Sequence, residues 1–161
     1  MAYGSSGRIL RVDLERGSCT FEQIDEATYR LYPGGKALAA WLLLRERAFD
    51  AEPLSPGNVL VVAAGLLTGA PASTASRFTV AARSPLTGAY GESEAGGYWG
   101  PELKMAGIEA IVVSGRAAQP TYLSIGEDGV SLRPAAHLWG LDPREVEQSI
   151  RAERGDPYVR V

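Results

Sequence analysis

Apolar and polar residues alternate along the first part of the chain, and the alternation predicts two antiparallel strands. The alternation covers residues 8–14 and resumes over residues 19–24. The sequence ERGS, which contains Gly17, lies between the two segments. A period of two places one face of a strand on a core, and a glycine in a short connection favours a tight turn. We therefore expect a β-hairpin at the start of the chain.

A helical pattern and several short apolar runs follow the hairpin. Residues 33–47, PGGKALAAWLLLRER, begin with helix breakers and then repeat leucine and tryptophan at helical spacing. The continuous apolar runs at 58–65 and 108–115 are typical of buried strands. Residues 77–93 predict two further strands around the turn SPLTG. The first two thirds of the chain thus mix one long helix with a sheet.

The same order of elements begins again near residue 121. Residues 121–134 predict a second hairpin, and a second helix follows with Asp142 as N-cap, Pro143 at the first position and Glu145 completing a capping box. Residues 157–161, PYVRV, read as the start of a strand. The order hairpin, helix, strand is therefore an internal repeat. Because an unpaired strand exposes backbone groups, we expect the chain to be a fragment or to be completed by another chain.

Composition narrows the class of protein. The 161 residues are 45% hydrophobic and 22% charged, as in ordinary globular proteins, and are enough for a sizeable core. The net charge of −3 argues against a nucleic-acid-binding protein, and no apolar run is long enough for a membrane span. Cys19 is the one cysteine, which excludes an internal disulfide and a self-contained iron–sulfur cluster. We expect a cytoplasmic protein with neither a nucleic-acid nor a membrane partner.

The sequence GESEAGGYWGPELK combines acids, adjacent glycines and aromatic residues. Glu92 and Glu94 would share a face of a strand, either as an acid/base pair or cation site or as solvated surface acids. Gly96 and Gly97 form either a tight turn or a patch of bare backbone that a flat or phosphorylated ligand can approach. A short helix follows, with Pro101 expected at its first position.

Two arginines and the lone histidine are further candidates. Arg77 and Arg83 lie in a strand-like segment, where each needs a partner, either a phosphate or a nearby glutamate. His137 lies beside leucine and tryptophan and is interpreted as a structural residue, and Cys19 as an inert thiol. The tryptophans are interpreted as core or interface anchors. Since no phosphate-loop, dinucleotide-binding or zinc motif is present, the residues alone indicate only a glycine-rich, arginine-flanked ligand surface.

A set of longer motifs, taken in their order along the chain, identifies a family resemblance. The motifs are GRILRVDL, AAGLLTG, RSPLTG, GGYWGPELKMAG, AIVVSGRA and HLWGLDP. In this order they resemble the N-terminal domain of the aldehyde ferredoxin oxidoreductase family, which are tungsten- or molybdenum-dependent enzymes. The resemblance runs from about Gly4 to Val161. It implies an α+β fold of duplicated β-α-β4 units that form two sheets, and residues 1–161 would be this pterin-platform domain, with the second unit incomplete at the C-terminus.

The resemblance also implies an activity. These enzymes oxidise an aldehyde and water to a carboxylate on a tungsten or molybdenum bis-pyranopterin, and a 4Fe-4S cluster passes the electrons to ferredoxin. No catalytic, metal or cluster ligand falls within this chain, so it is not competent alone. Its partners would be the remaining domains or a second chain, in a possible homo-oligomer. Alternatives are a non-catalytic binding or assembly module, or part of a ring-reducing aryl-coenzyme A reductase subunit.

The resemblance assigns cofactor-binding residues by position. Arg77 falls on an arginine that meets a pterin phosphate, and Glu94, Ala95, Gly96 and Gly97 fall on a pterin-contacting loop. Family members usually have Asn-Ser-Gly-Gly in that loop, so here a carboxylate stands beside an anionic cofactor. Either it hydrogen-bonds a pterin N–H, or a magnesium ion or an arginine lies nearby.

Overall fold

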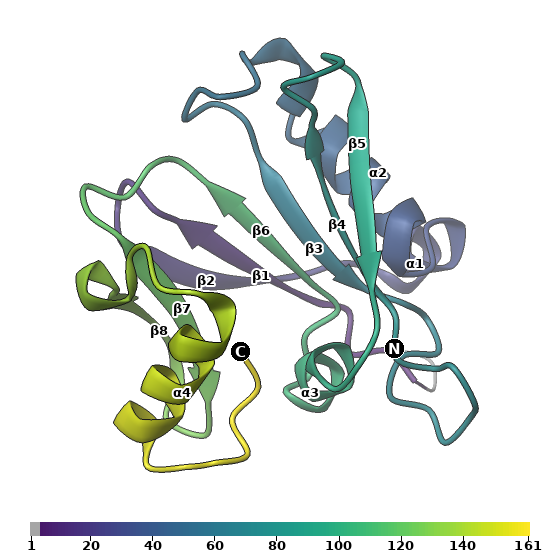
Figure 1. Ribbon diagram of the computed structural model, residues 1–161. Helices are drawn as coiled ribbons and strands as arrows, with labels where there is room; N and C mark the ends of the chain where they lie inside the picture. The colour runs from purple at the N-terminus through teal and green to yellow at the C-terminus, as the bar shows by residue number, and fades with distance from the viewer. Residues whose placement is uncertain (1–3) are drawn as a thin grey trace. The chain divides into compact units, whose positions relative to one another are not determined.

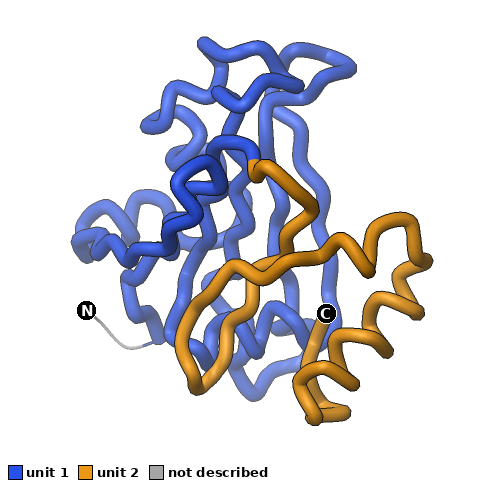
Figure 2. The backbone as a smooth tube through the Cα atoms, turned by 90° about the vertical axis from the view of Figure 1, so that its left-hand side faces the viewer, with its two compact units in different colours: residues 1–116 blue, residues 117–161 orange. Residues whose placement is uncertain are grey.

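The computed structural model describes residues 4–161, which form two compact units (Figure 2). Unit 1 extends to Arg116, and unit 2 covers Ala117–Val161. Together they contain a six-stranded sheet, a two-stranded sheet and four α-helices within the described residues. The fold class is therefore α+β, as predicted. No helix in residues 4–161 is long and apolar enough to cross a membrane.

Unit 1 is built on the six-stranded sheet (Figure 1). Its strands are β1 (Arg8–Asp13), β2 (Ser18–Gln23), β3 (Leu60–Ala64), β4 (Phe78–Arg83), β5 (Tyr90–Ala95) and β6 (Ala110–Ser114). The spatial order is β2-β1-β6-β3-β4-β5, and only the β1–β6 pair is parallel. The predicted first hairpin is confirmed as β1–β2, with Gly17 at a φ of 64° in its turn. The two edges of the sheet are β2 and β5.

Helix α2 (Gly35–Arg45) covers one face of this sheet and closes the main core. Its apolar side chains pack on alternate residues of the strands; the fully buried members of this core include Ile9, Leu38, Ala39, Leu42, Leu43, Val61, Ala63 and Ala110. A short 3₁₀ helix, η1 (Ala48–Asp50), follows α2. Helix α1 (Glu26–Leu31) was not predicted, although Asp25 caps it by accepting a hydrogen bond from the Thr28 amide at 2.8 Å.

Helix α3 (Trp99–Met105) begins two residues earlier than predicted, so Pro101 is its third residue and not its first. Packing explains the shift. The Trp99 ring contacts the Phe78 ring with centroids 4.9 Å apart, and a Cβ at Gly100 would lie 3.0 Å from the Ser76 carbonyl oxygen. These contacts with the start of β4 extend the helix toward β5.

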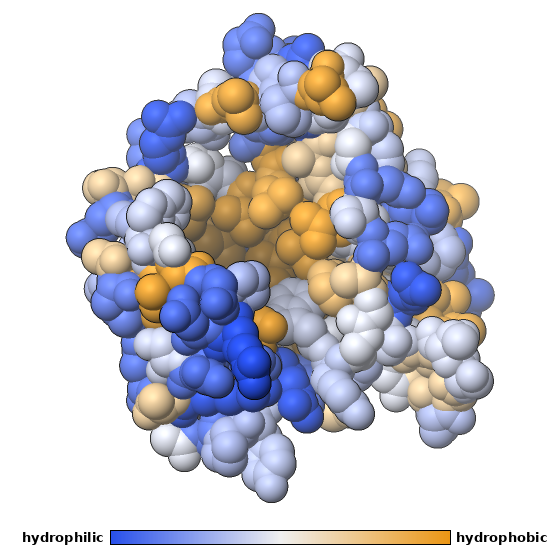
Figure 3. All heavy atoms as spheres, in the orientation of Figure 1, coloured by the Kyte–Doolittle hydropathy of each residue, from blue (hydrophilic) through white to orange (hydrophobic). Residues whose placement is uncertain are grey.

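The face of the sheet opposite α2 is apolar as well. Alternate residues of β3, β4 and β6 point to it, and Leu60 pairs with Val113 while Val62 pairs with Val80. Leu60 is 42% exposed and the other three are half-buried. Orange apolar surface accordingly lies over the middle of the sheet in Figure 3.

Unit 2 contains the second predicted hairpin and helix. Its elements are β7 (Thr121–Gly126), β8 (Gly129–Pro134), the 3₁₀ helix η2 (Ala136–Leu138) and α4 (Pro143–Arg154). The predicted capping box of α4 is confirmed, because Asp142 accepts from the Glu145 amide at 2.9 Å and Glu145 accepts from the Asp142 amide at 3.0 Å. Ala135, Leu138 and Ile150 form the core of the unit.

The strand predicted at 157–161 does not form; the chain makes a turn there instead. A strand requires a neighbour to pair with, and none lies beside these residues within the described chain. The Val159 carbonyl instead accepts a hydrogen bond from Arg151 Nε at 3.0 Å.

One buried carboxylate ties several parts of unit 1 together. Glu109 is 1% exposed and accepts hydrogen bonds from the Ser6 amide at 2.7 Å, Lys104 Nζ at 2.6 Å and the Tyr29 hydroxyl at 2.9 Å. Burial alone would raise the pKa of this carboxyl, but the Lys104 ammonium and the other donors outweigh it and the pKa lies below its usual value. The N-terminal segment, α1 and α3 are thereby all attached to the start of β6.

We predict that Glu109→Gln lowers the free energy of unfolding by about 3–5 kcal/mol at neutral pH, because it leaves the Lys104 ammonium buried without a counter-charge. The folded-state pKa of Glu109 is lowered, so its contribution is complete above about pH 4.5 and is lost as the pH falls through that lowered pKa. Denaturant unfolding as a function of pH measures both effects. The exposed Glu15→Gln is the control; equal stability of the two variants would contradict the prediction.

Main-chain atoms meet closely where α2 begins. Gly34 forms a β-bridge with Gly65 at the end of β3, with φ 65° and ψ −178°. A Cβ at Gly34 would lie 2.7 Å from the Leu66 nitrogen and 2.8 Å from the Ala64 carbonyl oxygen. The backbone conformation and the contact distance therefore both require glycine at this position.

We predict that Gly34→Ala destabilises the protein by more than about 2 kcal/mol, because the strain of a backbone conformation that is essentially restricted to glycine, about 1–3 kcal/mol, is added to a steric clash. Gly17→Ala is the matched variant, since Gly17 has a similar φ of 64° but open space around a Cβ. Thermal unfolding of both variants compares a positive-φ glycine in close contact with one in open space. A Gly34→Ala protein no less stable than Gly17→Ala would refute the close-contact explanation.

Candidate functional site

The five residues that the resemblance assigns to the cofactor lie together at one end of the β4–β5 pair. Phe78 pairs with Ala95, so Arg77 and Gly96 are neighbours just beyond that pair. Figure 1 shows β5 running from here into α3. Arg77 and residues 94–97 are all exposed. The chain therefore presents these residues on its surface and not in the core.

Arg77 is fixed through its main chain. Its carbonyl oxygen accepts hydrogen bonds from the Gly65 amide at 3.0 Å and from the Thr68 hydroxyl. Its side chain lies beside Gly96, where an added Cβ would be 4.0 Å from Arg77 Cδ and Nε. Within residues 4–161 the guanidinium makes no hydrogen bond or ion pair. It is thus a positioned cation with all of its donors available to an anion.

The two glycines beside Arg77 expose bare backbone. A Cβ at Gly96 would approach the Ser76 hydroxyl at 3.3 Å, so the turn packs closely against the loop before β4. Gly97 has a φ of 92° and open space where a Cβ would be. Backbone amides at such a position can meet a flat or anionic group without side-chain obstruction.

Glu92 and Glu94 share one face of β5, as predicted, and both carboxylates contact the same lysine. Lys36 Nζ, at the start of α2, lies 3.1 Å from Glu92 Oε1 and 3.4 Å from Glu94 Oε1. The hydrogen bond from Lys36 lowers the pKa of Glu92 and raises that of Lys36. Burial and the neighbouring Glu92 raise the pKa of Tyr90, whose hydroxyl donates to Glu92, to about 12. Glu92 and Glu94 thus supply the negative charges of a surface ion-pair cluster in which Lys36 is the cation.

Sequence reasoning missed Lys36 as part of this region. The lysine is 56 residues before Glu92, and only the fold brings them together. The available signal was the motif PGGK, because two glycines before a helix indicate that its first turn lies against other backbone.

Arg83 does not join Arg77. Its guanidinium donates to the carbonyl oxygens of Gly88 at 2.9 Å and Phe49 at 3.1 Å, and also to that of Ala51. Neither predicted partner, phosphate or glutamate, is therefore its partner here. The two arginines lie at opposite ends of β4, because Arg77 precedes the strand and Arg83 is its last residue. At 3.3 Å per residue they are about 20 Å apart.

The remaining candidates have structural surroundings. His137 Nε2 contacts one Glu153 carboxylate oxygen, and the Tyr122 hydroxyl donates to the other at 2.9 Å, so His137 is satisfied within unit 2. Burial raises the pKa of the Cys19 thiol, which agrees with an inert residue. Trp139 is 78% exposed, so of the two predicted roles it is not a core anchor, and the role of an interface anchor stays a prediction.

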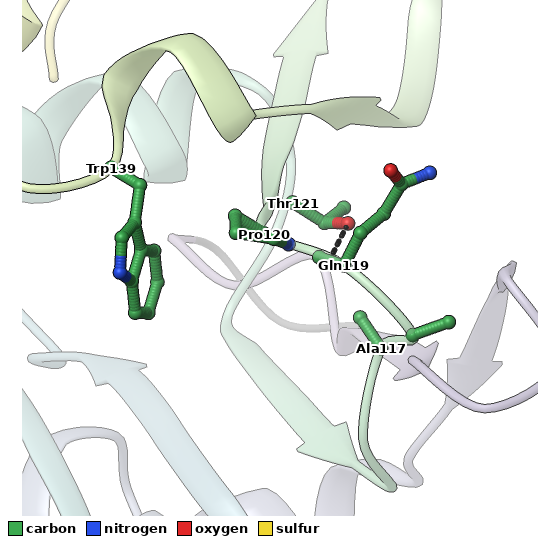
Figure 4. A pocket seen from close by; sticks show the side chains of 6 residues that line it. Ala117, Gln119, Pro120, Thr121 and Trp139 are labelled. Carbon is green, nitrogen blue, oxygen red and sulfur yellow. Dashed lines mark hydrogen bonds between the residues drawn. The ribbon is translucent and has the colours of Figure 1, made fainter.

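Unit 2 has a shallow hollow in its surface (Figure 4). It is lined by Ala117, Ala118, Gln119, Pro120, Thr121 and Trp139. The Thr121 hydroxyl donates to the Gln119 carbonyl at 2.9 Å, and none of the lining side chains is an acid, a base or a nucleophilic thiol. The hollow therefore offers no group for catalysis.

Comparison with known proteins adds to this geometry. The family profile described as "Aldehyde ferredoxin oxidoreductase, N-terminal domain" matches residues 9–161. The chain is 43% identical over 159 residues to a tungsten-containing aldehyde ferredoxin oxidoreductase of Pyrococcus furiosus, covering 99% of this chain and 26% of the relative. A protein of the same description from Thermococcus kodakarensis matches at 43% identity with the same coverage.

A solved structure is also similar to this chain. It is described as the active site complex BamBC of benzoyl coenzyme A reductase with 1,5-dienoyl-CoA, with a TM-score of 0.94 and 39% sequence identity, covering 98% of this chain and 24% of that one. The present chain thus spans about a quarter of the length of the relatives it matches. On the profile match and the identities together, the chain belongs to the aldehyde ferredoxin oxidoreductase family, in the region of its N-terminal domain.

Proposed function

We propose that residues 1–161 form the cofactor platform of a tungsten-dependent aldehyde:ferredoxin oxidoreductase, which converts an aldehyde and water to a carboxylate. The observation that carries the proposal is the Arg77 guanidinium, which is exposed, has no partner within residues 4–161 and lies against Gly96. The tungsten-containing relatives favour tungsten over molybdenum as the metal.

The residues present fit a bis-pyranopterin. Such a group has phosphates and flat fused rings; a planar guanidinium suits the first, and side-chain-free backbone suits the second. Arg77 would bind a phosphate, and the backbone of Glu94 to Gly97 would face a pterin ring. A Cβ at Gly97 would stand in open space on this surface. When bound, the metallopterin supplies the oxygen-transfer and electron chemistry.

The chain's own part is binding and orientation. Thr68 and Gly65 hold the Arg77 carbonyl, and Trp99 packs on Phe78 behind the loop, so the site is supported from two sides. Rigid support of this kind keeps a large cofactor in one orientation at little entropic cost.

Other parts of the enzyme would carry the rest of the reaction. We infer that the 4Fe-4S cluster ligands and the catalytic residues belong to the remaining domains or to a second chain, and that ferredoxin is the electron acceptor in the cytoplasm. We also infer that the β7–β8 hairpin and α4 begin a second β-α-β4 unit, because they repeat the order of β1, β2 and α2. We further propose that the complete enzyme is assembled as a homo-oligomer.

A second candidate is the active-site subunit of a ring-reducing aryl-coenzyme A reductase. It is favoured by the likeness to the benzoyl coenzyme A reductase complex, at 39% identity over 98% of this chain. The carboxylate at Glu94, where an asparagine is usual in the aldehyde-oxidising members, points the same way.

Purification of the full-length protein tests these candidates. We expect about one tungsten per protein by metal analysis, together with dye reduction that depends on an aldehyde. Dye reduction that instead depends on a dienoyl-coenzyme A substrate would support the second candidate. A full-length protein with neither tungsten nor molybdenum would refute the cofactor-platform proposal.

We predict that Arg77→Ala in the full-length protein weakens cofactor retention about 10- to 100-fold, the usual loss for a hydrogen bond to a charged group. Arg77→Lys should be intermediate, because it keeps the charge but not the bidentate geometry. Tungsten and pterin content after dialysis is the measurement. Arg30→Ala, at an exposed arginine paired with Glu26, is the control; equal retention by Arg30→Ala and Arg77→Ala would exclude a phosphate-binding role.

A further inference from the structure

We propose that Lys36 is a positioning residue that supplies the counter-charge for the acidic edge strand β5, so that an anionic cofactor can be held at Gly96 and Gly97 beside two carboxylates. The inference rests on the proposed function and extends it to a residue outside the cofactor-contacting loop. It also assigns a partner to the carboxylate of Glu94.

The contacts define one cluster, made of Lys36, Tyr90, Glu92 and Glu94. Lys36 Nζ contacts Glu92 Oε1 at 3.1 Å and Glu94 Oε1 at 3.4 Å, and the Tyr90 hydroxyl donates to Glu92 Oε2 at 2.9 Å. No other cation contacts these two carboxylates within the described residues. Within unit 1 the cation beside Glu94 is therefore the Lys36 ammonium and not an arginine.

Main-chain contacts place Lys36 over β5. Gly34 is bridged to Gly65, and a Cβ at Gly35 would lie 3.7 Å from the hydroxyl of Thr79. Thr79 pairs with Glu94 across β4 and β5. The first turn of α2 is thus fixed above β4, and the next residue, Lys36, reaches across Thr79 to both acids.

The charge balance gives Lys36 its role. Two carboxylates and one ammonium leave the cluster with one negative charge, and removal of Lys36 would leave two. Glu94 is two residues from Gly96, about 7 Å along an extended chain, which is within the screening length of about 8 Å at physiological salt. Uncompensated carboxylates at that distance would repel a bound phosphate that Arg77 attracts.

The same geometry defines what Glu94 does. Its carboxylate points to the α2 side of the sheet, toward Lys36, so Glu94 would contribute to the cofactor loop through its backbone. Lys36 compensates a negative charge that a neutral residue at position 94 would not carry. Lys36 and Glu94 are therefore one functional pair in this chain.

A charge-balance cycle in the full-length protein tests the inference. The variants are Lys36→Gln, Glu92→Gln and the double variant, with Lys36→Arg as the charge-conserving control. The measurement is the rate at which tungsten and pterin are lost during dialysis, at low salt and at about 1 M salt. Thermal unfolding of each apoprotein reports separately on folding.

We expect Lys36→Gln to lose the cofactor about two- to fivefold faster than wild type at low salt, the range of one or two exposed ion pairs. The double variant restores one negative charge and should return to within about twofold of wild type. Lys36→Arg, which keeps the charge of the cluster, should match wild type, and Glu92→Gln, which leaves the cluster without a net charge, should lose cofactor no faster than wild type. At about 1 M salt, where the screening length is about 3 Å, the Lys36→Gln defect should largely disappear.

Other results would overturn the inference. A Lys36→Gln protein that retains cofactor like wild type, or a double variant as defective as Lys36→Gln, would show that charge balance is not the role of Lys36. Faster cofactor loss by Lys36→Gln that persists at high salt would also contradict a charge-balance role. Equally fast loss by Lys36→Arg would contradict it as well. These outcomes require a wild-type protein that holds tungsten. A wild type without it refutes the proposed function itself.

Discussion

The contact of bare main chain between Gly34 and Gly65 is the constraint on which the candidate site depends. It fixes the start of α2 against the end of β3, and the Gly65 amide then binds the Arg77 carbonyl at 3.0 Å. One glycine pair therefore positions both the arginine beside Gly96 and the helix turn that carries Lys36. The main-chain framework of the site is therefore set by backbone contacts, and this framework carries the Arg77 and Lys36 side chains.

Unit 1 contains charged side chains that are paired with one another and, at Arg77, a charged side chain without a partner among the described residues. Glu109 and Lys104 are buried and fully paired, and Arg11 and Arg45 form a closed surface network with Glu22 and Glu46. The guanidinium of Arg77, in contrast, is exposed and has no partner within residues 4–161. Its donors are free to exchange water for an anion of matching bidentate geometry. This contrast is the physical basis for placing a ligand there.

Much of the fold could be predicted from local pattern, because its signals are local. The hairpins have a period of two and glycine turns, and α4 carries its own caps. Contacts between residues distant in sequence were harder to predict. Lys36 contacts Glu92 and Glu94 only after α2 folds onto the sheet. Tertiary packing also shifted α3, and the missing neighbour left 157–161 without a strand. The candidate site was predicted by family resemblance, and the residues alone indicated only its glycines and arginines.

The close approach at Gly34 has a consequence at the level of the gene. Every other amino acid carries a Cβ, and a Cβ there would lie 2.7 Å from the Leu66 nitrogen. Any missense change in that codon therefore introduces the same obstruction, whatever the chemistry of the new side chain, while third-base changes remain silent. In a saturation library every missense variant at this position would therefore carry at least the steric penalty of alanine.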